Sequence, residues 1–82
     1  MTSTATLADV GTGVWVTLGP PRLEPPHRRR LAEIGLRDGA AVFVLTRTSG
    51  GGRVLAVDDT RIALDQETLR RMPVVDNAAR PL

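Results

Sequence analysis

The sequence predicts a small, mainly β protein: a β-barrel of about five strands with one short α-helix and one helical turn. Short apolar runs recur along the chain and are separated by tight turns, which favours a barrel over a sandwich. Residues 41–46 are apolar on both faces, as expected of a strand that is covered from both sides. The 82 residues suffice for one domain with one small core.

Five segments have the composition of strands. In the first, Val14, Val16 and Leu18 alternate along one face, whereas Trp15 and Thr17 face the other way. A single tryptophan either closes one end of a small core, which is the interpretation we favour, or anchors a partner. The five expected strands cover residues 14–18, 41–46, 54–57, 61–64 and 72–74.

A short helix with a defined end precedes the second strand. Leu31 and Ile34 are three residues apart and share its apolar face. Gly35 is suited to the left-handed backbone that ends a helix, and Leu36 then falls where its side chain contacts Leu31 in a Schellman motif. Gly39 allows a second turn before the strand. We therefore assign a structural role to these five residues.

The start of this helix is less well defined by its sequence. The stiff, proline-rich loop over residues 19–26 offers no good N-cap, and three arginines follow in the first turns, where they oppose the helix dipole. We therefore expect burial of Leu31 and Ile34 to hold the helix. Further along, Ser49 to Gly52 form a hairpin tip, and Asp65 caps a helical turn over residues 66–71.

The ends of the chain are small and polar. We expect a disordered N-terminus over residues 1–6, one domain over residues 7–75 and a frayed tail over residues 76–82. No apolar run approaches the roughly 20 residues of a membrane span, and the first residues lack a signal-peptide pattern. We therefore expect a cytoplasmic protein.

The composition excludes several kinds of site. There is no cysteine, so disulfides and thiolate metal sites are excluded. His27 is the only histidine, so we expect no intrachain metal site and no cofactor; ligands shared between subunits stay open. No serine lies in a nucleophile motif, and Gly50 to Gly52 are not followed by the lysine and helix of a phosphate loop. The sequence therefore does not predict an enzyme.

Arginines are the candidates for a binding surface. All 11 basic residues are arginine, but the net charge is only +2, so we do not expect specific binding of nucleic acid. Arg28, Arg29 and Arg30 fan around the predicted helix, either as a solvated face or as a docking surface for an acidic partner. Arg47 and Arg53 on the outer face of the main hairpin form a second candidate.

These landmarks together resemble the FeoA family over about residues 7–75. The matching positions are Arg30, Leu31, Gly35, Leu36, Gly39, the run Ile62-Ala63-Leu64, Met72 and Val74, and the opening strand from Gly11 to Leu18. The resemblance implies an SH3-like barrel. It also implies a cytoplasmic accessory protein of bacterial ferrous-iron transport, whose membrane component carries a cytoplasmic G-protein domain.

The expected function is therefore that of a non-enzymatic module that contacts the transporter, without membrane insertion and with weak self-association at most. The same module resembles the C-terminal domain of iron-dependent repressors of the DtxR type. A freestanding repressor-type domain, or a small RNA-contacting barrel that binds through arginines, is thus the alternative. The proline-rich loop and Asp65, where the family often has a basic residue, depart from the pattern and leave the choice of partner open.

Overall fold

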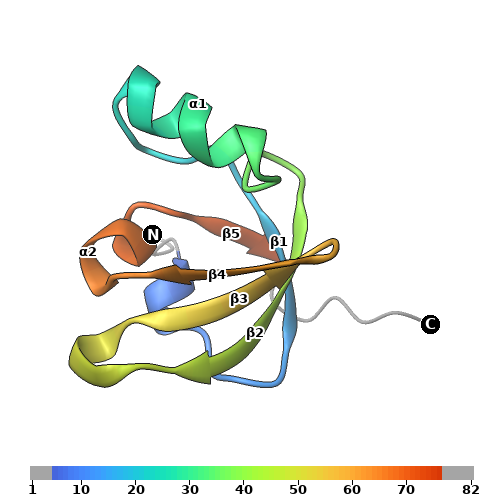
Figure 1. The fold of residues 1–82 in the computed structure, drawn as a ribbon, viewed down its shortest axis with the longest axis vertical. Helices are drawn as coiled ribbons and strands as arrows, with labels where there is room; N and C mark the ends of the chain where they lie inside the picture. Colours follow the sequence, from blue (N-terminus) through green and yellow to red (C-terminus); the bar gives the residue numbers. More distant parts are fainter. Residues whose placement is uncertain (1–4, 77–82) are drawn as a thin grey trace.

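The computed structural model describes residues 5–76 and contains five strands, two α-helices and two 3₁₀ turns (Figure 1). The expected fold class is confirmed, and the expected hairpins and the helical turn capped by Asp65 are present. In chain order the elements are η1 (Leu7–Asp9), β1 (Trp15–Leu18), α1 (Pro25–Glu33), β2 (Ala41–Arg47), η2 (Ser49–Gly51), β3 (Arg53–Val57), β4 (Thr60–Leu64), α2 (Gln66–Arg70) and β5 (Val74–Asp76).

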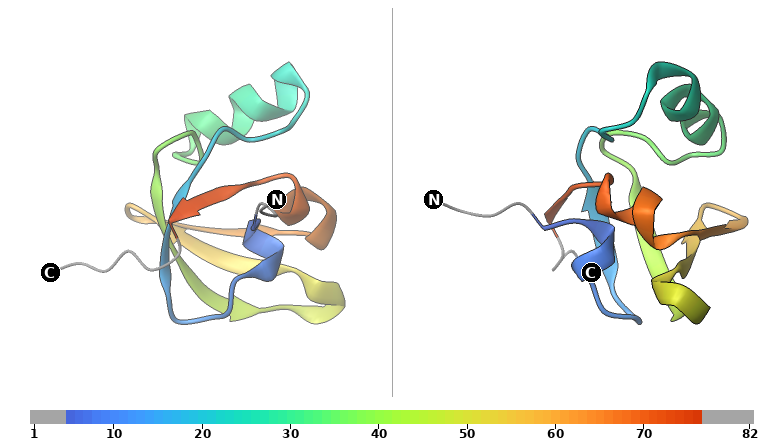
Figure 2. Two further views of the ribbon diagram at one scale, coloured as in Figure 1. Left: turned by 180° about the vertical axis from the view of Figure 1, so that it is seen from behind. Right: turned by 90° about the vertical axis from the view of Figure 1, so that its left-hand side faces the viewer.

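The strands form one antiparallel sheet in the order β4-β3-β2-β1-β5. The sheet curls, but its edge strands β4 and β5 are not paired with each other within the described chain. We expected a closed barrel, whereas the observed barrel is open. The last strand also begins at Val74, two residues later than expected. Pro73 has no N–H to donate to a neighbouring strand, which explains why β5 starts after it. Met72, which we expected in the strand, precedes it and is fully buried in the core. The chain thus passes from β4 to β5 through α2 (Figure 2).

The core lies on the inner face of the curled sheet and is closed by η1 and α2. The predicted alternation in the first strand is confirmed, because Val16 and Leu18 are fully buried. The same alternation buries the inward residues of β2 and β3, namely Val42, Val44, Leu55 and Val57. Leu7 from η1 and Leu69 from α2 complete this cluster. Figures 1 and 2 show α1 at one end of the sheet, where the start of the helix approaches α2.

The end of α1 is the predicted Schellman motif. Gly35 has a φ of 103°, in the left-handed region. The Leu36 N–H donates to the Leu31 carbonyl oxygen at 2.9 Å, and the Gly35 N–H donates to the Ala32 carbonyl oxygen at 3.0 Å, which is the bonding pattern of that motif. Leu31 and Leu36 are both buried. The helix therefore ends where the sequence places its stop.

Two neighbours of this motif behave differently from each other. Gly39 has a φ of 88°, as the expected second turn requires. Ile34, by contrast, is 41% exposed, so the prediction that it is buried with Leu31 is wrong. Ile34 is the C-cap residue, with φ −103° and ψ 11°, and this departure from helical geometry turns its side chain away from the buried stripe. Leu31 alone anchors the last turn of α1 in the core.

Trp15 does not close the core. It is 38% exposed on the outer face of the sheet, so the interpretation that we favoured for it is wrong. Its ring packs on that of Phe43, its partner across β1 and β2, with ring centroids 5.3 Å apart and planes inclined at 58°. The reason is the alternation itself, because burying Val16 and Leu18 turns Trp15 outward.

The N-terminal segment is fixed from Ala5 onward. The Thr6 side chain accepts from the Ala8 N–H at 3.2 Å, and the Asp9 carboxylate accepts from the Thr6 N–H at 2.9 Å, so η1 begins with a capping box. Thr6 also forms a bridge to Pro73. The expected disordered end thus includes two residues with defined structure. Residues 1–4 and the expected tail after Asp76 lie outside the described residues.

Candidate protein-docking site

The three arginines of α1 are exposed and carry unneutralised charge. The Arg28 side chain donates from Nη1 to the Leu23 carbonyl oxygen at 3.2 Å, which ties it to the preceding loop. In the part of the chain that the structure describes, no carboxylate oxygen lies within ion-pair distance of Arg28, Arg29 or Arg30. Their positive charge is therefore available to a partner.

The conflict with the helix dipole is smaller than the sequence suggested. The helix begins with Pro25 at its first position, and no side chain caps its N-terminus, as expected. Arg28 is then the fourth helical residue, and Arg30 falls in the last turn, where a positive charge is favourable. Pro25 and Pro26 suit the first turn because the N–H groups that they lack have no helical partner there.

A cleft of about 360 Å³ is lined by two of these three arginines. It lies between α1 and the loops that precede and follow the helix. Arg28 and Arg29 line the cleft, and Arg37 joins them from the loop after the helix stop, whereas Arg30 is not among the lining residues. The other residues that line the cleft are Pro20, Pro21, Pro25, Ala32 and Asp38.

Arg37 was not among the residues that the sequence singled out. No local pattern indicated it, because its place in the cleft depends on how the loop after Gly35 lies against α1. With three arginines and one aspartate, the cleft has an excess of positive charge. Its prolines and Ala32 supply apolar walls. This arrangement can bind an anionic group that carries a small apolar neighbour.

Only one of the two arginines of the second candidate surface, on the main hairpin, is exposed. Arg47 is exposed, but Arg53 is only 6% exposed and does not lie on the outer face as we expected. The Arg53 guanidinium donates to three carbonyl oxygens, those of Val10 at 3.1 Å, Gly51 at 3.1 Å and Ala8 at 3.0 Å. The bonds to Ala8 and Val10 join the hairpin to η1 and to the residue that follows it, and the bond to Gly51 stays within the hairpin. Arg53 therefore holds the fold and is not accessible to a partner.

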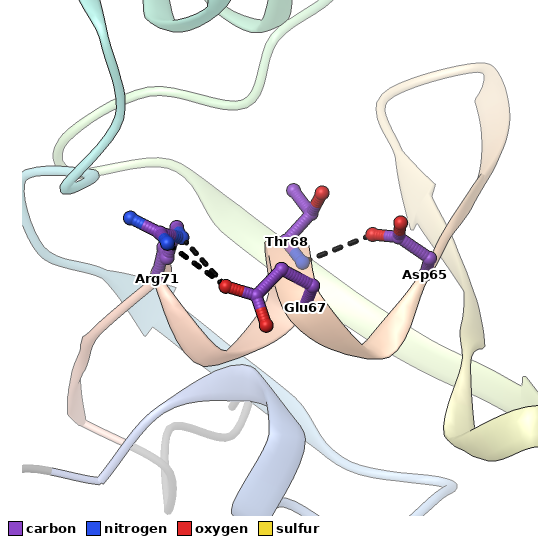
Figure 3. A network of polar contacts seen from close by, with 4 residues as sticks. All are labelled: Asp65, Glu67, Thr68 and Arg71. Carbon is purple, nitrogen blue, oxygen red and sulfur yellow. Dashed lines mark hydrogen bonds and ion pairs between the residues drawn. The ribbon is translucent and has the colours of Figure 1, made fainter.

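Helix α2 carries polar contacts that are structural (Figure 3). The Asp65 carboxylate accepts from the Thr68 N–H at 2.9 Å and caps the helix as predicted. Hydrogen bonding from Thr68, from its side chain first and its backbone second, holds the pKa of Asp65 below the ordinary value. Arg71 donates from Nε and Nη2 to one carboxylate oxygen of Glu67, at 3.0 and 2.9 Å. Both pairs are exposed.

His27 is the third residue of α1 and lines a cleft that residues of α2 also line. This second cleft has a volume of about 290 Å³ and is also lined by Glu24 and Glu67. Among residues 5–76, however, no three histidine, aspartate or glutamate side chains are grouped so that they could hold a metal ion. The arginine-lined cleft beside α1 is thus the better-defined candidate site.

In the same part of the chain, no helix is long and apolar enough to cross a membrane.

The curled five-stranded sheet with its connecting helices defines an SH3-like domain. The chain belongs to the FeoA family, because the model of the FeoA domain matches residues 6–75. FeoA domains are accessory domains of ferrous-iron transport. A comparison with curated proteins finds no match.

Solved structures support the same family. The FeoA protein of Chlorobium tepidum superimposes with a TM-score of 0.82 at 22% identity, over 94% of this chain and 74% of that one. The FeoA of Stenotrophomonas maltophilia, a prokaryotic SH3-domain protein solved in complex with zinc, superimposes with a TM-score of 0.71 at 25% identity, over 87% of this chain and 89% of that one. The zinc belongs to that protein.

A repressor shares the fold as well. A manganese-dependent transcriptional repressor superimposes with a TM-score of 0.77 at 22% identity, over 93% of this chain but only 43% of the repressor. At this identity the likeness concerns the fold alone. The same fold therefore also occurs within a longer chain.

Proposed function

We propose that this protein is a non-enzymatic accessory module of bacterial ferrous-iron uptake. In this proposal it acts in the cytoplasm by contact with the membrane transporter that carries a cytoplasmic G-protein domain. Membership of the FeoA family supports the role in iron transport. The observation that carries the proposal of a protein contact is the unneutralised charge of Arg28 and Arg29 on the exposed helix α1.

The chemistry of the surface supports binding rather than catalysis. The described residues include one histidine and no cysteine. His27 is exposed and lines a cleft with Glu24 and Glu67, and no described hydrogen bond joins it to a serine or threonine hydroxyl that it could activate as a nucleophile. The exposed arginines combine charge with neighbouring apolar area, which is the composition of a protein interface. Arg47 is a secondary candidate on the hairpin, whereas Arg30 does not line the cleft and is not assigned to the contact.

A direct binding measurement tests the proposal. The cytoplasmic region of the transporter, immobilised on a sensor surface, should bind the wild-type protein. The double variant Arg28→Glu with Arg29→Glu should bind about tenfold or more weakly, since each substitution replaces an attractive charge with a repulsive one. Circular dichroism establishes first that the variant is folded. Absence of wild-type binding would contradict the proposal.

The alternative, a nucleic-acid-binding module, predicts a different result. The net charge of +2 and the scarcity of aromatic residues weigh against it, because single-strand binders stack bases on aromatic side chains. We therefore expect no sub-micromolar binding of a DNA or RNA oligonucleotide at physiological salt in a fluorescence anisotropy titration. Tight binding that falls steeply with salt would favour the alternative.

A further inference from the structure

We propose that the cleft beside α1 receives a carboxylate side chain from an acidic segment of a protein partner. This inference rests on the proposed function and specifies how the contact is made. Three arginines line one cleft from two sides, Arg28 and Arg29 from the helix and Arg37 from the following loop. Guanidinium groups bind carboxylates through paired, parallel N–H donors.

The arginines of the cleft have no anionic partner among the described residues. Among the described residues, none of the three lies within ion-pair distance of a carboxylate, including that of Asp38 in the same cleft. Arg28 is held by its bond to the Leu23 carbonyl oxygen, which uses Nη1 and leaves the other donors of the guanidinium free. A side chain that is already oriented loses less conformational freedom on binding.

The apolar part of the cleft fixes the kind of ligand further. Pro20, Pro21 and Pro25 line it, and Pro21 is itself buried, so this wall is stiff. The cleft is partly open to solvent, and its volume of about 360 Å³ gives room for one or two side chains of a partner. We infer that the segment places an apolar side chain on the prolines, next to its acidic residue.

The apolar wall favours a carboxylate on a protein segment over a free phosphate ion. Three arginines and one aspartate give the lining a net positive charge, which attracts a phosphate at least as strongly as a carboxylate, so charge alone does not distinguish the two anions. A glutamate or aspartate in a protein segment has apolar neighbours that can contact Pro20, Pro21 and Pro25, whereas inorganic phosphate has none.

Helix α1 provides its own control. Arg30 has the same charge and the same exposure on the same helix, but it does not line the cleft. The proposal predicts that Arg37→Glu weakens binding to the transporter's cytoplasmic region by about tenfold or more, whereas Arg30→Glu changes it by less than about threefold. A general attraction between charged surfaces would weaken binding equally in both variants.

The ligand is identified with synthetic peptides. Short overlapping peptides from the cytoplasmic region are titrated into the wild-type protein, each with a matched version in which amides replace the carboxylates. An acidic peptide should bind, and its amide version should not. Inorganic phosphate serves as the competitor for the other anion. Arg37→Gln, which keeps a polar side chain of similar length, accompanies Arg37→Glu, and circular dichroism confirms that each variant is folded.

The outcomes separate the two proposals. If the wild-type protein binds neither the cytoplasmic region nor any peptide, the proposed function and the inference both fail. If the region binds but Arg30→Glu and Arg37→Glu have equal effects, the inference fails and the proposed function stands. Binding of the amide peptides, or displacement of the acidic peptide by phosphate at low concentration, would also overturn the inference. Loss with Arg37 variants and with amide peptides supports it.

Discussion

Arginine serves opposite purposes in two regions of this molecule. Beside η1, Arg53 is buried and all of its described bonds go to backbone carbonyl groups of the chain itself. Beside α1, Arg28, Arg29 and Arg37 line an open cleft and have no carboxylate partner in the described structure. The first region uses a guanidinium to hold the fold, and the second leaves three arginines without an ion-pair partner among the described residues.

The comparison teaches that the type of residue does not decide its role. Burying a charge is costly unless hydrogen bonds satisfy it, and three carbonyl acceptors within 3.1 Å do so for Arg53. The arginines of α1 remain in contact with water, so they are not costly to the fold. Substitutions in the two regions should therefore differ in kind, and the following predictions are ordered by the size of the expected effect.

Arg53→Met should produce the largest loss of stability. It removes three charge-assisted hydrogen bonds and leaves the carbonyl groups of Ala8, Val10 and Gly51 without this donor, so we expect the free energy of unfolding to fall by about 3 kcal/mol. Arg47→Met is the matched control, because Arg47 is paired with Arg53 across the hairpin but is exposed. It should change stability by less than about 0.5 kcal/mol in urea unfolding. Equal effects would refute the distinction.

Gly35→Ala should have the next largest effect. Alanine pays for the positive φ of 103°, and its Cβ would lie 2.7 Å from Cγ1 of Val57 in the core, so we expect a loss of about 2 kcal/mol. Gly39→Ala is the control, because Gly39 has a positive φ of 88° but no atom within 4 Å of the added Cβ. Its loss should be about 1 kcal/mol, from backbone strain alone. Thermal unfolding of both variants gives the comparison.

Acid should weaken the cap of α2. The pKa of Asp65 is lowered in the folded protein, so its carboxylate stabilises the fold above the ordinary value of 3.8, and this contribution is lost as the pH falls through the folded-state pKa. Asp65→Asn keeps an N-cap acceptor that does not titrate. The difference in melting temperature between wild type and Asp65→Asn should therefore shrink as the pH is lowered from neutral to acidic. A constant difference would exclude this role for Asp65.

The sequence predicted those parts of the fold that depend on local patterns. The Schellman stop follows from the spacing of Leu31, Gly35 and Leu36, and the cap of α2 follows from Asp65, because both motifs are complete within a few residues. The capping box at Thr6 and Asp9 is equally local and was missed, although the spacing of a threonine three residues before an acid indicates it.

Features that depend on distant contacts were not predictable in this way. Arg53 finds its acceptors 43 and 45 residues earlier in the chain, at Val10 and Ala8, and no local pattern indicates that meeting. Trp15 is a different case, because the alternation with Val16 and Leu18 had already placed it on the opposite face, and we preferred the general tendency of tryptophan to be buried over that pattern. The cleft combines two loops and a helix, so only the folded chain shows that Arg37 belongs to it and Arg30 does not.

The central claim is that the arginines left free by the fold attract the partner. Its most direct test is the association rate constant with the transporter's cytoplasmic region at low and at high salt, for wild type and for Arg28→Glu with Arg29→Glu. Attraction between opposite charges predicts that the wild-type rate falls by about tenfold or more as salt screens it. The double variant should associate slowly and with little dependence on salt. A wild-type rate that is independent of salt, or equal rates for the two proteins at low salt, would contradict the claim.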